Sequence, residues 1–282
     1  MNQIKAMTDT EYRAHTSIAN SDLSYILQGQ HHFLHYKQQG SHSTPAMLIG
    51  TTYHHNVLEP AEQMKGITSD TKFIESHPEL LKNGKISRNA KAYQEWKKMT
   101  IALGDEIVKD EDIKIIAEMT TSSRAHTWLI KMLSHPNGMN EKAFFFELYG
   151  VPCKAKLDHF HEDELCNIVI DLKSTEDCSI DNIMKSINKY HYYRQDAFYS
   201  EAATAQNGKP TLYYFAFQEK TYPFGMRVVQ LGTKYKEVGN REIATALEKY
   251  KNFPAEPPKH PYGDSFEVLS CPNWLSREEG EE

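Results

Sequence analysis

The segment that most constrains the fold is 167–173, which reads NIVIDLK. Its three consecutive β-branched residues predict a strand that runs through the middle of a sheet. The strand ends in Asp171 and Lys173, and because alternate residues of a strand share a face, these two side chains project together. Charged groups at the end of a buried strand need partners. The two residues can simply pair with each other, or they can belong to a site, and the triplet alone does not decide.

The segments around this strand predict an α/β fold. Helical periodicity or helix boundary signals occur at 17–36, 45–59, 87–103, 110–134, 179–188, 190–206 and 233–251. Strand patterns occur at 141–149, 153–160, 167–173, 211–218 and 225–231. We therefore expect a mixed central β-sheet flanked by helices, preceded by an N-terminal helical region. The expected single domain comprises a mainly helical part (1–135), an α/β core (136–252) and a Pro-rich extended arm (253–282).

Composition places the chain among soluble globular proteins, with 39% hydrophobic and 25% charged residues. No run approaches eighteen apolar residues, so we expect no transmembrane helix. The N-terminus lacks the apolar region of a signal peptide, which favours a cytoplasmic location. The four cysteines show no CxxC or metal-finger spacing, so we expect reduced thiols.

The net charge of −6 argues mildly against a general polyanion-binding protein. However, the last six residues, REEGEE, contribute −3 of it. Basic residues also form two local clusters, one at Lys82, Lys85, Arg88, Lys91, Lys97 and Lys98 and one at Lys185, Lys189 and Arg194. Each cluster is either a solvated helix face or part of a positively charged groove.

Asp158 gives the Asp171–Lys173 pair a chemical context. It lies at the end of the preceding predicted strand, on the same face as Lys154 and Lys156. If the two strands are neighbours, Asp158 and Asp171 converge on one cation, and such oxygen ligands suit Mg²⁺ or Mn²⁺. Lys173 would then orient or activate the attacking water and stabilise charge developing on a phosphate.

Two helical segments add candidate residues. In GTTYHHNVLEP (50–60), His54 shares a stripe with Met47, Gly50 and Leu58, which predicts an inward position. A single inward histidine is more often a core residue than a ligand, and we favour His54 over His55 for a site. In YHYYRQDAFYSEAATA (190–205), a second stripe holds Tyr192, Gln195, Tyr199 and Ala202. This stripe is either a core face or a face turned toward a site.

Together these motifs resemble the PD-(D/E)xK nuclease superfamily. The D-(x)₁₂-D-x-K spacing of Asp158, Asp171 and Lys173 carries the resemblance, although Leu157 stands where the family name has proline. The GxxxHxxxLEP run and the QxxxY helix extend it. Over about residues 20–205 the chain is similar to RecE-type (exodeoxyribonuclease VIII) exonucleases of phages and prophages.

The resemblance implies a restriction-endonuclease-like core and a role for each matching residue. It implies His54, Asp158 and Asp171 at the metal and Lys173 as the catalytic lysine, with Gln195 and Tyr199 in support. The family's upstream acidic residue corresponds to Glu141 or Glu147, and the sequence does not choose between them.

The implied activity is that of a Mg²⁺-dependent deoxyribonuclease in which Mn²⁺ can substitute. The resemblance further implies 5′→3′ degradation from double-stranded DNA ends, a ring-shaped homo-oligomer and a RecT-type single-strand annealing partner. Two alternatives stay open. One is a non-catalytic DNA-binding or recombination protein on a decayed nuclease fold, and the other is an endonuclease of the same superfamily.

Overall fold

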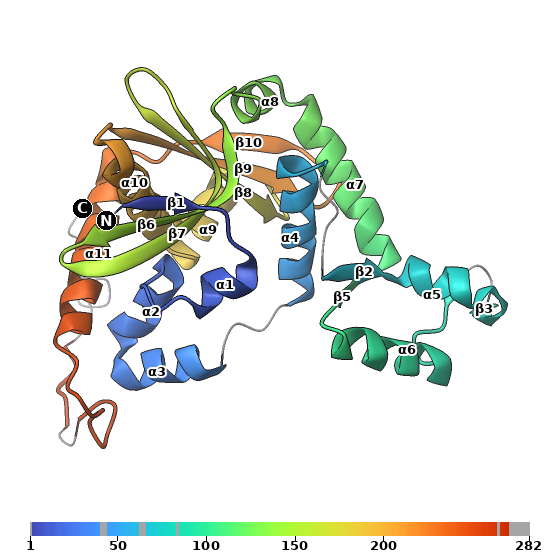
Figure 1. The fold of residues 1–282 in the computed structure, drawn as a ribbon, viewed down its shortest axis with the longest axis horizontal. Helices are drawn as coiled ribbons and strands as arrows, with labels where there is room; N and C mark the ends of the chain where they lie inside the picture. Colours follow the sequence, from blue (N-terminus) through green and yellow to red (C-terminus); the bar gives the residue numbers. More distant parts are fainter. Residues whose placement is uncertain (1, 40–43, 62–65, 83–84, 264–265, 271–282) are drawn as a thin grey trace, which may run out of the picture.

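The computed structural model describes residues 2–39, 44–61, 66–82, 85–263 and 266–270. Its centre is a six-stranded sheet with helices on both faces (Figure 1). The strand order is β1-β6-β7-β8-β9-β10, in which β8 and β9 are parallel and all other neighbours are antiparallel. The strands are β1 (Gln3–Lys5), β6 (Met139–Leu148), β7 (Val151–Glu162), β8 (Asn167–Thr175), β9 (Thr211–Glu219) and β10 (Met226–Val229). The expected mixed α/β fold is confirmed.

Helices are present in every segment of the described chain where the sequence predicts one, but two of the predicted helices are each divided into two. The described helices are α1 (Asp9–Ala14), α2 (Asn20–Gln28), α3 (Gln30–Gln39), α4 (Pro45–Leu58), α5 (Asp70–Ser76), α6 (Lys91–Ala102), α7 (Asp110–Ala125), α8 (Thr127–Leu133), α9 (Ile180–Lys189), α10 (Tyr192–Asn207) and α11 (Thr233–Lys251). The predicted helix 17–36 is two helices, because Gly29 adopts φ 144° between α2 and α3. The predicted helix 110–134 is likewise interrupted at His126, whose imidazole caps α8 by accepting the N–H of Leu129.

Two apolar cores cover the faces of the sheet. Val169 of β8 belongs to the core formed with α2, α10 and α11, whereas Ile168, Ile170 and Leu172 belong to the core formed with α4, α7 and α8. This alternation explains the unbroken apolar run in the sequence, since a strand covered on both faces needs apolar side chains on both. β8 therefore holds the position in the middle of the sheet that its composition predicted.

The parallel pairing of β8 with β9 requires a crossover, which α9 and α10 provide. α10 packs on the sheet through Ala197, Phe198 and Ala202, and α11 covers α10 in turn. This crossover brings α10 over the face of β8 onto which Asp171 projects.

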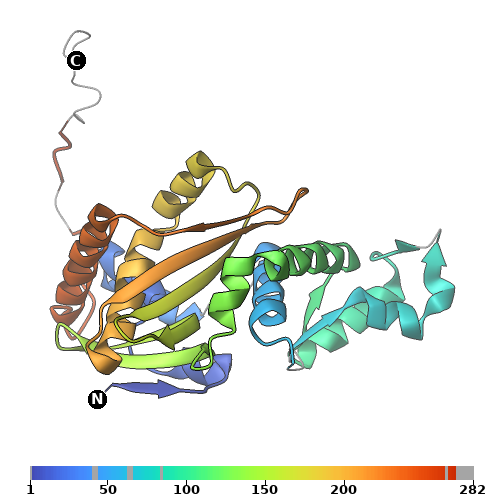
Figure 2. The ribbon, with the colours of Figure 1, turned by 90° about the horizontal axis from the view of Figure 1, so that it is seen from above.

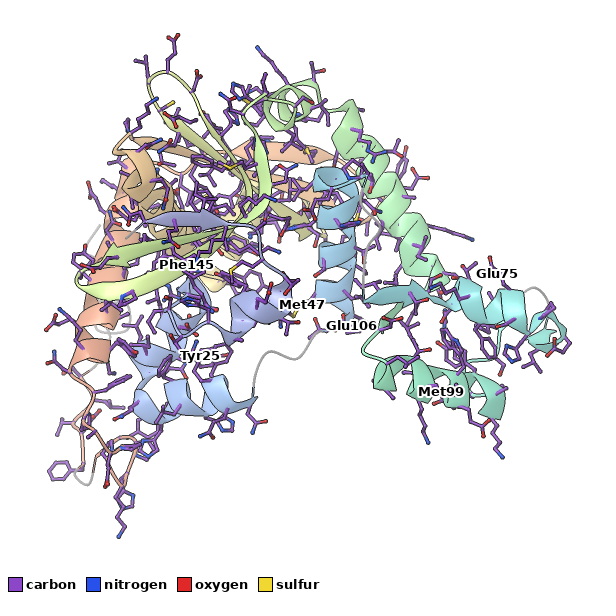
Figure 3. The ribbon with its side chains drawn as sticks, viewed as in Figure 1. Tyr25, Met47, Glu75, Met99, Glu106 and Phe145 are labelled. Atoms are coloured by element: carbon purple, nitrogen blue, oxygen red, sulfur yellow. The ribbon has the colours of Figure 1, made fainter. Side chains whose placement is uncertain are left out.

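A small lobe projects away from the sheet (Figures 1 and 2). It comprises β2 (Ile67–Ser69), α5, the 3₁₀ turn η1 (Pro78–Leu80), the short strands β3 (Leu81–Lys82) and β4 (Lys85–Ile86), α6 and β5 (Glu106–Val108). Aromatic rings of Phe73, Tyr93 and Trp96 fill its interior. Met99 lies on its surface, 66% exposed (Figure 3).

The structure changes the interpretation of the basic clusters. Arg194 is 3% exposed and pairs with Glu242, so it does not belong to a charged surface. Arg88 binds Asp70 and Glu111 within and beside the lobe. Lys97 and Lys98 on α6 and Lys185 and Lys189 on α9 are exposed. The side chains of Lys82 and Lys85 lie outside the described part.

The predicted C-terminal arm is described at 253–263 and 266–270, where it forms neither helix nor strand. Its remaining residues, with Cys271, lie outside the described residues. Cys153, Cys166 and Cys178 are free thiols. Among the described helices, none combines the length and the apolar character needed to cross a membrane.

Candidate active site

The site forms where β6 and β7 depart from regular geometry. In a regular strand, residues three positions apart face opposite sides of the sheet. Leu157 and Phe160 of β7 nevertheless both face the core beneath α10, so β7 is irregular at Asp158 and His159 between them. On β6, Glu141 lies opposite Asp158 and adopts φ 53°, in the left-handed region that L-residues seldom occupy. This distortion presents the Glu141 and Asp158 carboxyl groups together at one point of the sheet.

Three side chains from three elements meet there. Oxygen or nitrogen atoms of His54 (α4), Glu141 (β6) and Asp158 (β7) all lie within 4.8 Å of one another. His54 Nδ1 lies 3.4 Å from Asp158 Oδ2. Two carboxylates and an imidazole can together hold a divalent metal ion, so the residues fit a divalent cation at this position.

The electrostatics of the group favour a bound cation. Burial raises the pKa of the Asp158 carboxyl well above its usual value, and the nearby charges of Asp171 and Glu141 raise it further. Burial also raises the pKa of Glu141, against the lowering effect of Lys156. Burial and the charge of Lys173 lower the pKa of His54 to about 3, so its imidazole is neutral at pH 7. A cation would offset the repulsion between the buried carboxyl groups, and a neutral imidazole beside them has a free nitrogen lone pair for a metal.

β8 continues to Thr175, so the predicted end of this strand at Lys173 was wrong. Asp171 and Lys173 lie beyond Ile170, the last β8 residue whose backbone pairs with β7, and next to these donors. Asp171 is 2% exposed and pairs with the ammonium group of Lys173. Gln195 of α10 donates from Nε2 to Asp171 Oδ1 at 2.6 Å. The backbone N–H of Leu172 donates to Asp158 Oδ2 at 2.8 Å, which links β7 and β8 beyond the last backbone pair between them, His159 and Ile170. The predicted neighbourhood of Asp158, Asp171 and Lys173 is therefore present in the fold.

Burial lowers the pKa of Lys173, but the charge of Asp171 and its other neighbours raise it by more, so the net pKa is above the usual value. Lys173 is therefore an ammonium ion at neutral pH. Its Nζ lies 4.9 Å from the centre of the Tyr192 ring, a cation–π distance. Such a lysine acts as a hydrogen-bond donor and a positive charge.

Tyr199 supports the site from α10. Burial raises the pKa of its phenol well above the usual value, and the side chain of Gln195 hydrogen-bonds to it. The phenol therefore stays neutral and holds the glutamine that holds Asp171. The predicted QxxxY stripe faces β8.

The predicted inward stripe on α4 was wrong in detail. The buried residues are Tyr53, Val57 and Leu58, whereas Met47 is 50% exposed (Figure 3). His54 lies at the edge of the buried face, where it reaches Asp158 instead of the core. His55 lies 3.6 Å from Glu59 on the same helix.

Glu141 was one of two open candidates in the sequence, and the structure separates them. Glu141 lies in the donor group and pairs with Lys156 at 2.6 Å, whereas Glu147 is exposed further along β6. Both carboxylate oxygens of Asp171 face protein partners, Lys173 and Gln195, and Asp171 is not part of the group of three donors. Its role as a direct metal ligand therefore stays a prediction.

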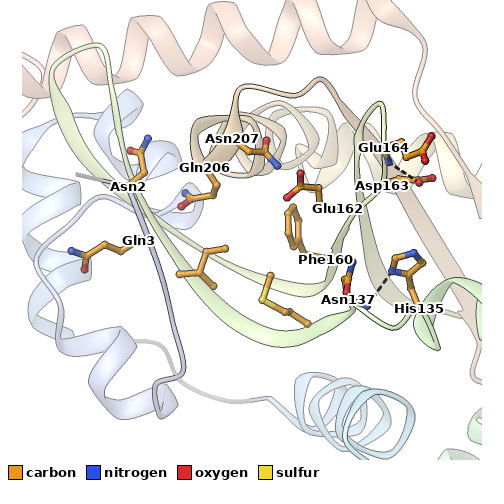
Figure 4. A pocket seen from close by; sticks show the side chains of 12 residues that line it. Asn2, Gln3, His135, Asn137, Phe160, Glu162, Asp163, Glu164, Gln206 and Asn207 are labelled. Carbon is orange, nitrogen blue, oxygen red and sulfur yellow. Dashed lines mark hydrogen bonds between the residues drawn. The ribbon is translucent and has the colours of Figure 1, made fainter.

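A cavity of about 850 Å³ opens elsewhere, between β1, the end of β7 and the end of α10 (Figure 4). Its lining includes Glu162, Asp163 and Glu164, and none of its described lining residues is a lysine or arginine. Lys209 pairs with Glu162 at 2.6 Å, but Asp163 and Glu164 still give the lining a net negative charge, which disfavours a phosphate-bearing ligand. The cavity is separate from the donor group on β6 and β7.

Three comparisons with known proteins bear on the fold and the family of this chain. No curated protein matches the chain by sequence. A crystal structure from Eubacterium rectale, of a protein provisionally named an exonuclease, matches with a TM-score of 0.58 at 15% identity, covering 95% of this chain and 96% of that one. The structure of SSO0001 matches 74% of this chain and 89% of its own at 13% identity, with a TM-score of 0.28.

The fold is thus shared with the Eubacterium rectale protein over nearly the whole length of both chains. A family model, described as a PDDEXK-like domain of unknown function (DUF3799), matches residues 19–261. That range contains α4, the distorted β6–β7 pair, β8 and the crossover helix α10. The chain belongs to this family of PDDEXK-like domains.

Proposed function

We propose that the protein is a metal-dependent deoxyribonuclease that hydrolyses DNA phosphodiester bonds. The observation that carries the proposal is the convergence of His54, Glu141 and Asp158 beside the Asp171–Lys173 pair. A divalent cation held there would polarise the scissile phosphate and lower the pKa of a bound water.

The chain's own residues supply the rest of the chemistry. Lys173, protonated and held by Asp171, offers N–H donors and positive charge to phosphate oxygens as negative charge develops. Gln195 and Tyr199 fix the orientation of Asp171 and, through it, of Lys173. His54 stays neutral and offers a nitrogen ligand.

Within this activity we propose a 5′→3′ exonuclease that acts on double-stranded DNA ends in phage-type recombination. The resemblance to RecE-type enzymes supports this choice, as does the fold shared with a protein named as an exonuclease. A ring-shaped homo-oligomer and a RecT-type annealing partner are parts of the same proposal.

The test is digestion of 5′- and 3′-labelled linear duplex DNA with Mg²⁺, next to the Asp171→Ala and Lys173→Ala variants. We expect loss of label from the 5′ end first and no digestion by either variant. Lys220→Ala is the matched control, because Lys220 is about as exposed as Lys173 and pairs with Glu176 outside the site. Full activity in Asp171→Ala would refute the assignment.

Two further measurements separate the alternatives. Cutting of a closed circular duplex would identify an endonuclease, since an exonuclease needs an end. Calorimetric titration with Mn²⁺ tests for a decayed site, which would bind no metal. We expect an intact circle and measurable Mn²⁺ binding.

A further inference from the structure

We propose that Tyr190 and Lys189 form a binding platform for a nucleotide next to the scissile phosphate, with the Tyr190 ring stacked on its base. This inference rests on the proposed nuclease function and names how the substrate strand is held. Tyr190 follows the last residue of α9 and is 55% exposed. None of the steps described for the metal group, Asp171 or Lys173 uses it.

Two aromatic rings, those of Tyr192 and Tyr190, connect Lys173 with the surface. Tyr192 stacks on Phe215 with ring centres 5.6 Å apart, and Lys173 Nζ lies 4.9 Å from the Tyr192 centre. The Tyr190 ring lies 5.6 Å from that of Tyr192, with an angle of 32° between the planes. Two short steps therefore separate the lysine from an exposed ring. A strand in a duplex advances about 3.4 Å per base, so these steps span no more than about three bases.

The backbone between the two tyrosines is arranged to bring their rings together. In a continuous helix, residues two positions apart do not face each other. His191, between them, adopts φ 53° and ψ 40°, in the left-handed region, and this residue turns the chain from α9 into α10. Such a conformation is unfavourable for a residue with a side chain, so the surrounding structure must hold it.

A half-buried network holds this turn. His191 Nδ1 lies 2.8 Å from Tyr193 Oη, and that hydroxyl donates to Glu242 Oε1 of α11 at 2.8 Å. Glu242 also pairs with the buried Arg194. The backbone at Tyr190 is thus held by residues on α10 and α11, and the Tyr190 ring contacts that of Tyr192. A ring carried on a held backbone has less conformational freedom to lose when a ligand stacks on it.

The charge around Tyr190 fits a nucleic acid. Lys189 Nζ lies 5.1 Å from the centre of the Tyr190 ring, and Lys185 is exposed one turn earlier on α9. An exposed ring beside ammonium groups is the combination that binds single nucleic-acid strands, because the ring stacks on a base while the cations contact phosphates. The same ring would accept any base, so the platform would add affinity without sequence preference.

The test uses the full-length protein and a linear duplex that carries 2-aminopurine at each of the three terminal positions in turn. Binding is measured with Ca²⁺ in place of Mg²⁺, which keeps the DNA uncut. We expect wild-type protein to quench 2-aminopurine at one position. Tyr190→Ala should lose that quenching and weaken binding roughly tenfold to a hundredfold. Tyr190→Phe keeps the ring and should retain both properties.

Tyr149→Ala is the matched control, since Tyr149 is 52% exposed and lies in the β6–β7 turn, at the opposite end of β6 from Glu141. With Mg²⁺, Tyr190→Ala should raise KM more than it lowers kcat. If Tyr190→Ala binds, quenches and cleaves like Tyr149→Ala, the platform is refuted while the nuclease assignment stands. If wild-type protein neither binds nor cleaves DNA, both proposals fail.

Discussion

Gln195 on α10 donates a 2.6 Å hydrogen bond to Asp171 in the middle of β8. Asp171 is almost fully buried, and Lys173 from its own strand holds its second oxygen. The Asp171 carboxylate is therefore held between the amide of Gln195, which comes from the helical layer, and the ammonium group of Lys173, which comes from the sheet. Because Lys173 depends on Asp171 for its position, the glutamine acts on the lysine without touching it.

Gln195→Ala should lower DNA cleavage by about 10- to 100-fold, the usual effect of removing a group that orients a site residue. The free energy of unfolding should change much less than the rate. Gln206→Ala, on the same helix but bonded to backbone carbonyls outside the site, is the control. Steady-state cleavage rates and thermal melting of the two variants check this. Equal rates in both variants would show that the hydrogen bond has no functional role.

Metal binding should distinguish Glu141 from Glu147. In wild-type protein, Mn²⁺ at one hundred times its Kd should add about 2.7 kcal/mol to the free energy of unfolding. Glu141→Gln removes one of the three grouped donors, so the rise in Tm on adding Mn²⁺ should shrink strongly. Glu147→Gln, on the exposed part of the same strand, should show the wild-type rise. Thermal melting with EDTA and with Mn²⁺ measures both, and identical shifts would exclude Glu141 as a ligand.

Asp196 should make stability depend on pH. Burial raises its pKa from 3.8 to about 6 in the folded protein, despite the opposing charge of Lys236. Between these two values the folded state binds more protons than the unfolded state, so this residue's contribution to stability falls as pH rises from about 4 to about 6. The rise in the pKa of Asp196 from 3.8 to about 6 corresponds to roughly 3 kcal/mol of folding free energy.

Asp196→Asn removes this titration but keeps an oxygen that can accept from Ser200, which lies 3.1 Å from Asp196 Oδ1. The variant should therefore gain stability relative to wild type as pH rises from 4 to 7. Urea unfolding of both proteins at each pH gives the difference directly. A difference that stays constant with pH would contradict the raised pKa.

Gly239 marks the closest approach of α11 to α10. A Cβ at this position would lie 2.6 Å from the carbonyl oxygen of Tyr193 and 2.9 Å from Ala197 Cβ. Gly239→Ala should thus force the helices apart and lower the free energy of unfolding by about 1–3 kcal/mol. At Gly232 an added Cβ meets nothing within 4 Å, so Gly232→Ala should have little effect. Urea unfolding compares the two, and equal stability would mean that the helices adjust freely.

Much of the fold could be predicted because its signals are local. The apolar run of β8 and the Thr44–Pro45 start of α4 depend on neighbouring residues alone. The Asp158–Asp171 neighbourhood followed from two strands close in sequence. Gly29 shows the limit of periodicity, because the apolar pattern continues across a residue at which the helix stops.

The site was harder to predict where it depends on distortion. Glu141 enters the donor group because its backbone leaves the regular strand conformation, and the sequence around it reads as an ordinary strand. Arg194 looked like part of a basic surface, yet tertiary packing buries it against Glu242 and Ser24. The sequence does not reveal that α11 covers the side of α10 on which Arg194 lies.

The parallel pairing of β8 with β9 also has a consequence for synthesis of the chain. The ribosome makes His54 first, then the two carboxylate-bearing strands, and Gln195 only after β8 is complete. Gln195 is made 24 residues after Asp171, and α10 also packs on β9. We therefore expect the crossover to dock fully only once β9 has emerged beside β8, and Asp171 and Lys173 lack their amide partner until then. A nascent chain that stops early therefore carries the charges of the proposed nuclease but not the geometry that would let it cut DNA.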